Sequence, residues 1–249
     1  MGLVKGGYEW APLFHIPIPG RSNPLIVIPT TYEVIAEVNL VESGFKVRVL
    51  GTSDSRYVSG KIEDFLTNLS SELGMEISLE LKVKASARAP REYTYVHATN
   101  TALEFLGGKL DEDVIEASWR IDSKLGLPQS VFALREAQMI GEPYIWRLNE
   151  GYVKLGKVLT AEVLSSSEVP IALNPSTRFV DLLTHLAGVS IVNIFTGLRD
   201  GEDVSDSVRL YNALWYAIHG IYPPSCSGKG VGLIFPDLDK ALISEVIIE

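Results

Sequence analysis

The sequence predicts an α+β fold with two lobes, because its strands and helices follow one another in blocks and do not alternate strictly as β-α-β units. Runs rich in β-branched residues fill residues 25–50, and a strictly alternating strand follows at residues 76–84. Groups of helices and strands then share the rest of the chain. With 249 residues, 46% hydrophobic and 21% charged, the chain is long and apolar enough for a substantial core.

In the N-terminal half, the first 20 residues are rich in Pro and Gly and are expected to be extended or looped. "LIVIP" and "YEVIAEVNLV" predict strands, and "FKVRVLG", which comes after the turn "ESG", predicts a hairpin. The segment "KIEDFLTNLSSELG" predicts a helix that stops at Gly74. Two apolar faces should be buried: on this helix Ile62, Phe65, Leu66, Leu69 and Leu73, and on the alternating strand Ile77, Leu79, Leu81 and Val83, which should pack on helices.

The second half continues with predicted helices in "EYTYVHATNTALEFLGG" and "DEDVIEASWRIDSKLG" and predicted strands in "PYIWRL" and "YVKLGKVLTAEVL". "SSSEVPIALNPS" reads as a loop. Two amphipathic helices, "TRFVDLLTHLAG" and "DSVRLYNALWYAIHG", precede a glycine loop and the strand "VGLIF". We place the lobe boundary near residue 155, which gives an N-terminal lobe at 1–155 and a C-terminal lobe at 156–249.

Composition excludes several functional classes. The net charge of −9 disfavours nucleic-acid binding, since that needs clustered Lys and Arg. No run of about 18 apolar residues predicts a membrane helix, and the N-terminus does not have the pattern of a signal peptide. One cysteine, Cys226, rules out an internal disulfide and a cysteine-based zinc site. We therefore expect a cytoplasmic protein without nucleic-acid or membrane partners, and the scarcity of Gln and Cys favours a thermophilic source.

Familiar catalytic motifs are missing from the sequence. The four histidines do not have metal-ligand spacing, and no GxSxG, HExxH or CxxC motif occurs. The acidic clusters "DEDVIE" and "GEDVSD" are typical of helix N-termini, where acids act as caps or dipole partners.

Two short segments leave a choice between a turn and an anion site. "PGRSN" is either a Pro-Gly turn or a place where Arg21 binds an anionic substrate. In "CSGKGVGLIFPD", three alternating glycines surround Lys229 and precede a strand. Such a loop can gather backbone N–H groups around a phosphate, but it does not have the spacing of a P-loop, and a plain turn remains the alternative.

Taken in order, these segments resemble the GHMP kinase superfamily, whose members phosphorylate small metabolites with ATP. "PGRSNPL" corresponds to the first motif, "MEISLELKVKASARAPREYTYVHATNTALEFLGG" to the second motif and its helix, and "CSGKGVGLIFPD" to the third. The stretch "IEASWRIDSKLGLPQSVFALREAQMIGEPYIWRLNEG" is most similar to archaeal pantoate kinases. The sequence departs from the family at the second motif, which has no glycine between Met75 and Phe105, and at the catalytic aspartate, for which Asp122 and Glu136 are the nearest acids.

The resemblance implies a divergent ATP-dependent kinase for a small anionic, pantoate-like metabolite, with ATP and Mg²⁺ as cofactors and a homodimer as one open arrangement. A degenerate paralogue that binds a metabolite or a protein without chemistry is the alternative. In either case the third-motif loop should line the cleft between the lobes. No residue is assigned as catalytic or as a metal ligand; the substrate- or phosphate-binding candidates are Gly20, Arg21, Asn23, Arg88, Arg91, Ser227, Gly228, Lys229, Gly230 and Gly232.

Overall fold

The computed structural model describes residues 2–86, 90–107, 109–171, 179–222 and 230–249. Contacts divide the chain into two compact units. Unit 1 comprises residues 1–9 and 31–139, and unit 2 comprises residues 10–30 and 140–249. This division differs from a single boundary near residue 155, because the two N-terminal strands each run from one unit into the other.

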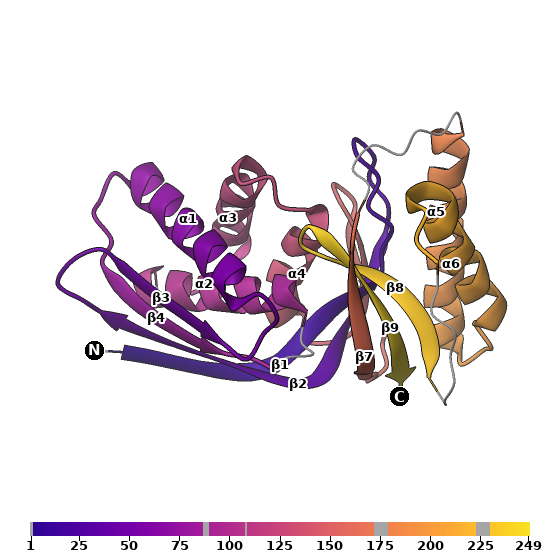
Figure 1. Ribbon diagram of the computed structural model, residues 1–249, viewed down its shortest axis with the longest axis horizontal. Coiled ribbons are helices and arrows are strands. Elements are labelled where there is room, and N and C mark those ends of the chain that lie inside the picture. Colours follow the sequence, from indigo (N-terminus) through magenta and orange to yellow (C-terminus); the bar gives the residue numbers. More distant parts are fainter. Residues whose placement is uncertain (1, 87–89, 108, 172–178, 223–229) are drawn as a thin grey trace. The chain divides into compact units, whose positions relative to one another are not determined.

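Unit 1 is an α+β layer of strands covered by helices (Figure 1). Its elements are the first part of β1 (Gly2–Phe14), the second part of β2 (Leu25–Leu40), β3 (Phe45–Leu50), α1 (Ser55–Leu73), β4 (Leu79–Lys84), α2 (Arg91–Gly107), α3 (Glu112–Lys124) and α4 (Gln129–Ile140). The predicted α+β class is correct.

The predicted hairpin between the second and third strands is wrong. Strand β4 lies between them, antiparallel to β2 and parallel to β3. A parallel pair needs a long crossover connection, and α1 supplies it between β3 and β4. Strand β4 begins at Leu79, later than the predicted strand at 76–84, but the alternation was the stronger signal, since Ile77, Leu79, Leu81 and Val83 are all buried.

Helix α1 follows its sequence signals closely. Gly74 ends it in the left-handed conformation with φ 62°, and its N–H donates to carbonyls of the last turn. Ile62, Phe65, Leu66 and Leu69 are buried, whereas Leu73 is exposed, contrary to the prediction. At the other end, the Asp54 side chain accepts a hydrogen bond from the Tyr57 N–H and caps the helix.

Unit 2 is a second α+β layer. Strand β9 lies between β7 and β8 and is antiparallel to both. Strand β5 pairs antiparallel with β6 and with the start of β2. The elements that belong wholly to this unit are β5 (Tyr144–Arg147), β6 (Gly151–Lys154), β7 (Ala161–Pro170), α5 (Val180–Asp200), α6 (Ser205–His219), β8 (Val231–Asp237) and β9 (Lys240–Ile248), and the first part of β2 joins them. The predicted loop at "SSSEVP" is wrong, because β7 continues to Pro170 in register with β9.

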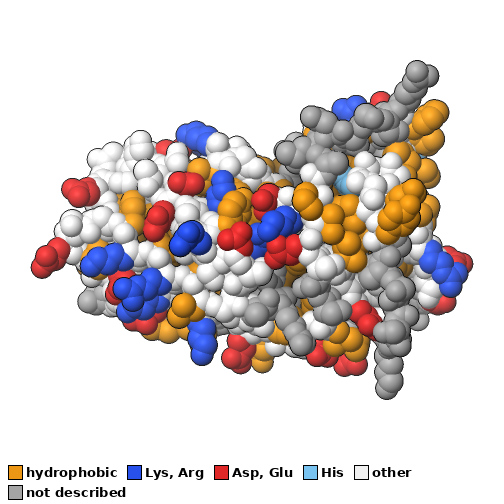
Figure 2. Space-filling model, viewed as in Figure 1, with side chains coloured by type: hydrophobic (Ala, Val, Ile, Leu, Met, Phe, Trp, Pro, Cys, Tyr) orange, Lys and Arg blue, Asp and Glu red, His pale blue; other side chains and the backbone are white. Residues whose placement is uncertain are grey.

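Helices α5 and α6 pack side by side in unit 2, and apolar side chains gather over them in Figure 2. Within the described residues, α5 is the one helix long and apolar enough in composition to cross a membrane, which is weak evidence for a span. One third of its most apolar window is buried. The buried side of α5 carries Ala187, Ile191, Ile194 and Phe195, as expected of a helix that packs on a neighbour.

Candidate functional site

The candidate site begins at the "PGRSN" loop of unit 2, which forms a tight turn. The Arg21 N–H donates to the Ile18 carbonyl at 3.0 Å, with Pro19 and Gly20 at the two central positions. Gly20 has φ +70°, the value that a type II turn requires at its third residue. The buried Asn23 side chain closes the loop by donating to the Ile16 carbonyl at 3.2 Å. The sequence therefore encodes the turn itself, and the turn places Arg21 at the surface.

Arg21 opens onto a pocket of about 570 Å³ that lies entirely within unit 2. We call it the anion pocket. Two arginines, one carboxylate and one histidine give it a polar character, and valines of α5 give it an apolar wall: Arg21, Arg147, Asp181, His185, Val189 and Val192. Its volume lies within the range of small-molecule sites.

Arg21 is held by an ion pair across the anion pocket. Its Nε and one terminal nitrogen donate to Oδ1 of Asp181 at 3.0 Å and 2.5 Å. Both side chains keep contact with solvent, with relative exposures of 46% and 80%. The second arginine, Arg147 at the end of β5, donates through Nε to the Ser22 carbonyl at 3.3 Å and pairs with Glu150 at 2.7 Å. The pocket thus presents two guanidinium groups that can bind a carboxylate or phosphate.

Helix α6 fixes the polypeptide that leads into this loop. The buried Tyr211 hydroxyl lies within hydrogen-bond distance of the Leu13, His15 and Ile234 carbonyls and can donate to one of them at a time. It also accepts from the His15 N–H at 3.2 Å. One helix therefore holds the end of β1 against β8.

His15 is buried beside this hydroxyl, and burial lowers its pKa to about 4. A backbone hydrogen bond at Pro24 opposes this shift, and the charge of His219 adds to it. The His219 ring nitrogen in turn contacts the Pro17 carbonyl at 2.8 Å. His15 and His219 are both buried, and they pack the segment that leads into the loop.

Strand β8, which follows the glycine loop, contacts the same helix, α6. The Asn212 side chain of α6 donates to the Gly232 carbonyl at 2.8 Å, and the Gly230 N–H donates to the Glu245 carboxylate at 3.0 Å. The other predicted residues of this loop, Ser227, Gly228 and Lys229, lie outside the described residues, as does Arg88. That Arg21 and residues 227–230 converge on one anion stays a prediction.

Arg91 is one of the two phosphate-binding candidates in the second motif, with Arg88, and its side chain is completely buried in unit 1. It is the first residue of α2, and its guanidinium lies 5.8 Å from the ring centre of Tyr57. Glu92 beside it is also fully buried and accepts a hydrogen bond from Ser130 at 2.9 Å. Thr94 donates to another buried carboxylate, Glu9, at 3.4 Å.

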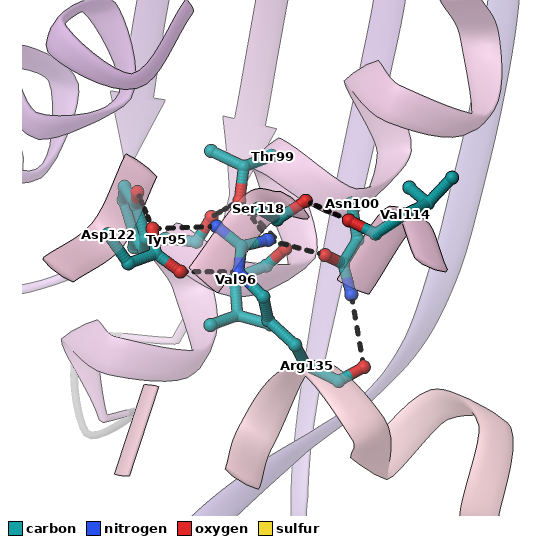
Figure 3. Close-up of polar contacts among 8 residues, drawn as sticks. All are labelled: Tyr95, Val96, Thr99, Asn100, Val114, Ser118, Asp122 and Arg135. Carbon is teal, nitrogen blue, oxygen red and sulfur yellow. Dashed lines mark hydrogen bonds and ion pairs between the residues drawn. The ribbon is translucent and has the colours of Figure 1, made fainter. Parts of the chain in front are cut away.

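Asp122, one of the two acids nearest to the missing catalytic aspartate in the sequence, belongs to a buried polar cluster (Figure 3). Arg135 donates through Nε to one Asp122 oxygen at 2.6 Å and through a terminal nitrogen to the other at 2.9 Å. Tyr95 donates its hydroxyl to the same carboxylate at 2.6 Å. A carboxylate that is fully buried and already paired with a guanidinium is not placed to accept a proton from a substrate.

No protein-derived metal site accompanies these groups in the part of the chain that the structure describes, where no cluster of three His, Cys, Asp or Glu side chains could hold an ion.

Solved structures resemble the chain along almost its whole length. Mevalonate kinase of L. major, in complex with R-mevalonate, is 15% identical with a TM-score of 0.61, over 97% of this chain and 86% of the other. Streptococcus pneumoniae phosphomevalonate kinase, in complex with phosphomevalonate and AMPPNP, is 10% identical with a TM-score of 0.59, over 98% and 92%. A Legionella pneumophila mevalonate diphosphate decarboxylase is 11% identical with a TM-score of 0.60, over 98% and 93%.

The chain has the GHMP-kinase fold. At identities of 15% and below, this likeness establishes the fold and leaves the activity to be argued from the site. No protein-family model matches the sequence. No curated protein matches it either.

Within the GHMP-kinase fold of this chain, the sequence identified Arg21 and Asn23 as site candidates but did not indicate the other titratable residues of the anion pocket, Arg147, Asp181 and His185. Arg147 sits at the end of a short predicted strand, and Asp181 reads as an ordinary acid in the first turn of a helix. Neither position carries a motif, so only the tertiary structure brings them to Arg21.

Proposed function

We propose that this chain binds a small anionic metabolite in the anion pocket and acts as a divergent ATP-dependent kinase of that metabolite, with a pantoate-like hydroxy acid as the substrate class. The observation that carries the proposal is the pairing of two solvent-accessible guanidinium groups, Arg21 and Arg147, in one pocket. Arginine forks match carboxylate and phosphate geometry, so a small acid is the ligand that this pocket fits best.

The fold supports the kinase part of the proposal. The likeness to metabolite kinases covers nearly the whole chain, and one of those kinases is bound to AMPPNP, an ATP analogue, beside its phosphorylated substrate. ATP with Mg²⁺ is accordingly the proposed phosphoryl donor, in a cytoplasmic protein. A homodimer is proposed as one arrangement that size-exclusion chromatography with light scattering can test.

The first turn of α2 does not fit the triphosphate as a glycine-rich cradle would. Side chains of Arg91, Glu92, Tyr93 and Thr94 are buried there, and none of these residues is a glycine that would let a phosphate approach the backbone. Glu92 also places a carboxylate at the helix end that favours anions. A phosphate brought to this turn would meet the buried carboxylates of Glu92 and Glu9 as well as the buried guanidinium of Arg91.

This misfit favours a second candidate function, a paralogue that binds the metabolite in the anion pocket and performs no phosphoryl transfer. Both candidate functions use the anion pocket for the metabolite, and they differ only in whether the chain also binds ATP and transfers its phosphoryl group. Losing two backbone hydrogen bonds to phosphates, each worth about 1.5–3 kcal/mol, would weaken nucleotide binding by roughly 100-fold or more. Weak ATP binding and slow or absent transfer to pantoate are therefore expected.

Two measurements separate these functions. Isothermal titration calorimetry with pantoate tests the shared pocket, with Arg21→Gln as the variant and Arg120→Gln, an exposed arginine of α3 paired with Glu116, as the matched control. Binding that is lost in Arg21→Gln and kept in Arg120→Gln supports the pocket.

Titration with Mg-ATP and a coupled assay on pantoate then test the kinase. Micromolar ATP affinity with steady turnover establishes the kinase and shows that the buried first turn of α2 is no obstacle. Pantoate binding without nucleotide binding supports the paralogue. If pantoate fails to bind at all, the proposed ligand class is wrong.

A further inference from the structure

The anion pocket changes character along α5. Its lining residues on this helix recur at intervals of three and four, from Asp181 through His185 and Val189 to Asn193, so they form one face. Twelve residues of α-helix span about 18 Å. Charged and polar groups lie at the first two turns, Val189 and Val192 follow on the next turns, and the polar Asn193 ends the face; Pro24 of the loop also lines the pocket.

A ligand that matches this sequence of polar and then apolar lining groups has a charged head and an apolar body. The head faces Arg21 at the start of α5, where Asp181 now accepts two hydrogen bonds from the guanidinium. The body faces Val189 and Val192, which are 39% and 47% exposed and offer apolar surface for a ligand to cover. Apolar contact of this kind adds affinity roughly in proportion to the carbon surface buried.

We propose that Asp181 competes with the ligand for Arg21 and that Val189 and Val192 select a small acid with a branched aliphatic body. This inference rests on the proposed binding of an anionic metabolite in the pocket, and it adds two features. The Arg21–Asp181 ion pair must open for the ligand's carboxylate or phosphate to reach the guanidinium. The valines make the affinity depend on the carbon skeleton as well as on the charge.

The competition predicts that removing the charge of Asp181 tightens binding. Asp181→Asn keeps the shape of the side chain and abolishes its ion pair with Arg21. Exposed ion pairs are weak, so the dissociation constant for pantoate should fall by about two- to fivefold at low ionic strength. Asp206→Asn is the matched control, because Asp206 is also an exposed acid in the first turn of a helix and also pairs with an arginine, Arg209, at 2.9 Å.

The selection by valines predicts a preference among acids. Pantoate and glycerate carry the same carboxylate and hydroxyl groups, and pantoate has one additional dimethyl-substituted carbon. Burying those carbons should make pantoate bind roughly 10- to 50-fold more tightly than glycerate. Val192→Thr, which keeps the size of the side chain and replaces one methyl group with a hydroxyl, should reduce that ratio several-fold. Inorganic phosphate has no apolar body, so it probes the charged end of the pocket alone. Comparing its binding with that of the two carboxylic acids distinguishes a phosphate site from a carboxylate site.

The experiment is a calorimetric titration of the full chain and each variant with pantoate, glycerate and inorganic phosphate. Tighter pantoate binding in Asp181→Asn, unchanged binding in Asp206→Asn and a lower pantoate-to-glycerate ratio in Val192→Thr support the inference. If the dissociation constant for pantoate is the same in Asp181→Asn and Val192→Thr as in the unmodified chain, the inference is wrong. Pantoate would then bind at another site, and the proposed binding function would still hold. If pantoate and glycerate both fail to bind, phosphate alone decides whether the head site exists, and an acid with a branched body is excluded.

Discussion

The buried ion pair of unit 1 offers the sharpest test of how this fold is stabilised. Replacing Arg135 with methionine removes the guanidinium but fills much of its volume. In the structure, Arg135 donates two hydrogen bonds to Asp122, one to Thr99 at 3.1 Å and one to Asn100 at 2.6 Å. Its guanidinium also lies 4.8 Å from the centre of the Phe65 ring. Burial lowers the pKa of Arg135, but the charge and hydrogen bonds of Asp122 outweigh this and raise the pKa, so the arginine is charged.

Arg135→Met should lower the free energy of unfolding by about 3–5 kcal/mol, because it leaves the Asp122 carboxylate buried without its counter-ion. For a chain of this length, about 1 kcal/mol corresponds to roughly 2–4 °C in the midpoint of thermal unfolding. The midpoint should therefore fall by about 6–20 °C. Adding Asp122→Asn removes the stranded charge and keeps an acceptor for Tyr95, so the double variant should be more stable than Arg135→Met alone.

Urea titrations followed by circular dichroism measure these free energies. Hydrogen exchange read by mass spectrometry locates the loss in α2, α3 and α4. Arg120→Gln is the control, since its exposed pair with Glu116 should contribute less than about 1 kcal/mol. A loss below about 1 kcal/mol in Arg135→Met, or a double variant less stable than the single one, would refute the reasoning that Asp122 depends on this arginine.

The remaining predictions concern a buried histidine and a glycine. The folded-state pKa of His15 is lowered to about 4 from 6.5, so below about pH 6.5 the unfolded chain binds a proton that the folded chain does not. Stability should fall by up to about 3 kcal/mol as the pH drops from about 7 to about 4, and urea titrations of His15→Gln should lack this component of the decline. Gly51 has φ +93°, and an added Cβ would lie 1.8 Å from the Ala85 carbonyl oxygen. Gly51→Ala should therefore cost more than about 2 kcal/mol, whereas Gly44→Ala, with φ +69° and open space, should cost about 1 kcal/mol by the same titration; equal costs would contradict the clash.

Local patterns predicted the elements that depend on local physics. The turn at Gly20, the Gly74 stop of α1 and the alternating face of β4 are set by backbone conformation and side-chain period, and all three are present. The pairing of β3 was predicted wrongly because a turn after β2 does not reveal which strand will lie beside it. The parallel partner, β4, follows only after the intervening helix α1.

The candidate site was predictable in part for the same reason. Arg21 stands in a recognisable turn, so its exposure follows from sequence. Its partners Arg147 and Asp181 are 126 and 160 residues away along the chain, at positions without motifs. Helix α6 shows how segments distant in sequence are brought together. Tyr211 and Asn212 look like ordinary helix residues in the sequence, but their side chains hydrogen-bond to segments near both ends of the chain.

Helices α2 and α5 each carry an acid in the first turn, with opposite consequences for an anion. In α2, Glu92 is fully buried and bonded to Ser130, so no small ligand can exchange with it without opening the core. In α5, Asp181 is 80% exposed, and its partner Arg21 remains accessible. An incoming anion could replace Asp181 at the cost of one exposed ion pair, which is worth less than about 1 kcal/mol. Replacing Glu92 would expose a buried charge and cost several times more. On this energetic ground the anion pocket beside α5 is a better place for an anion than the first turn of α2.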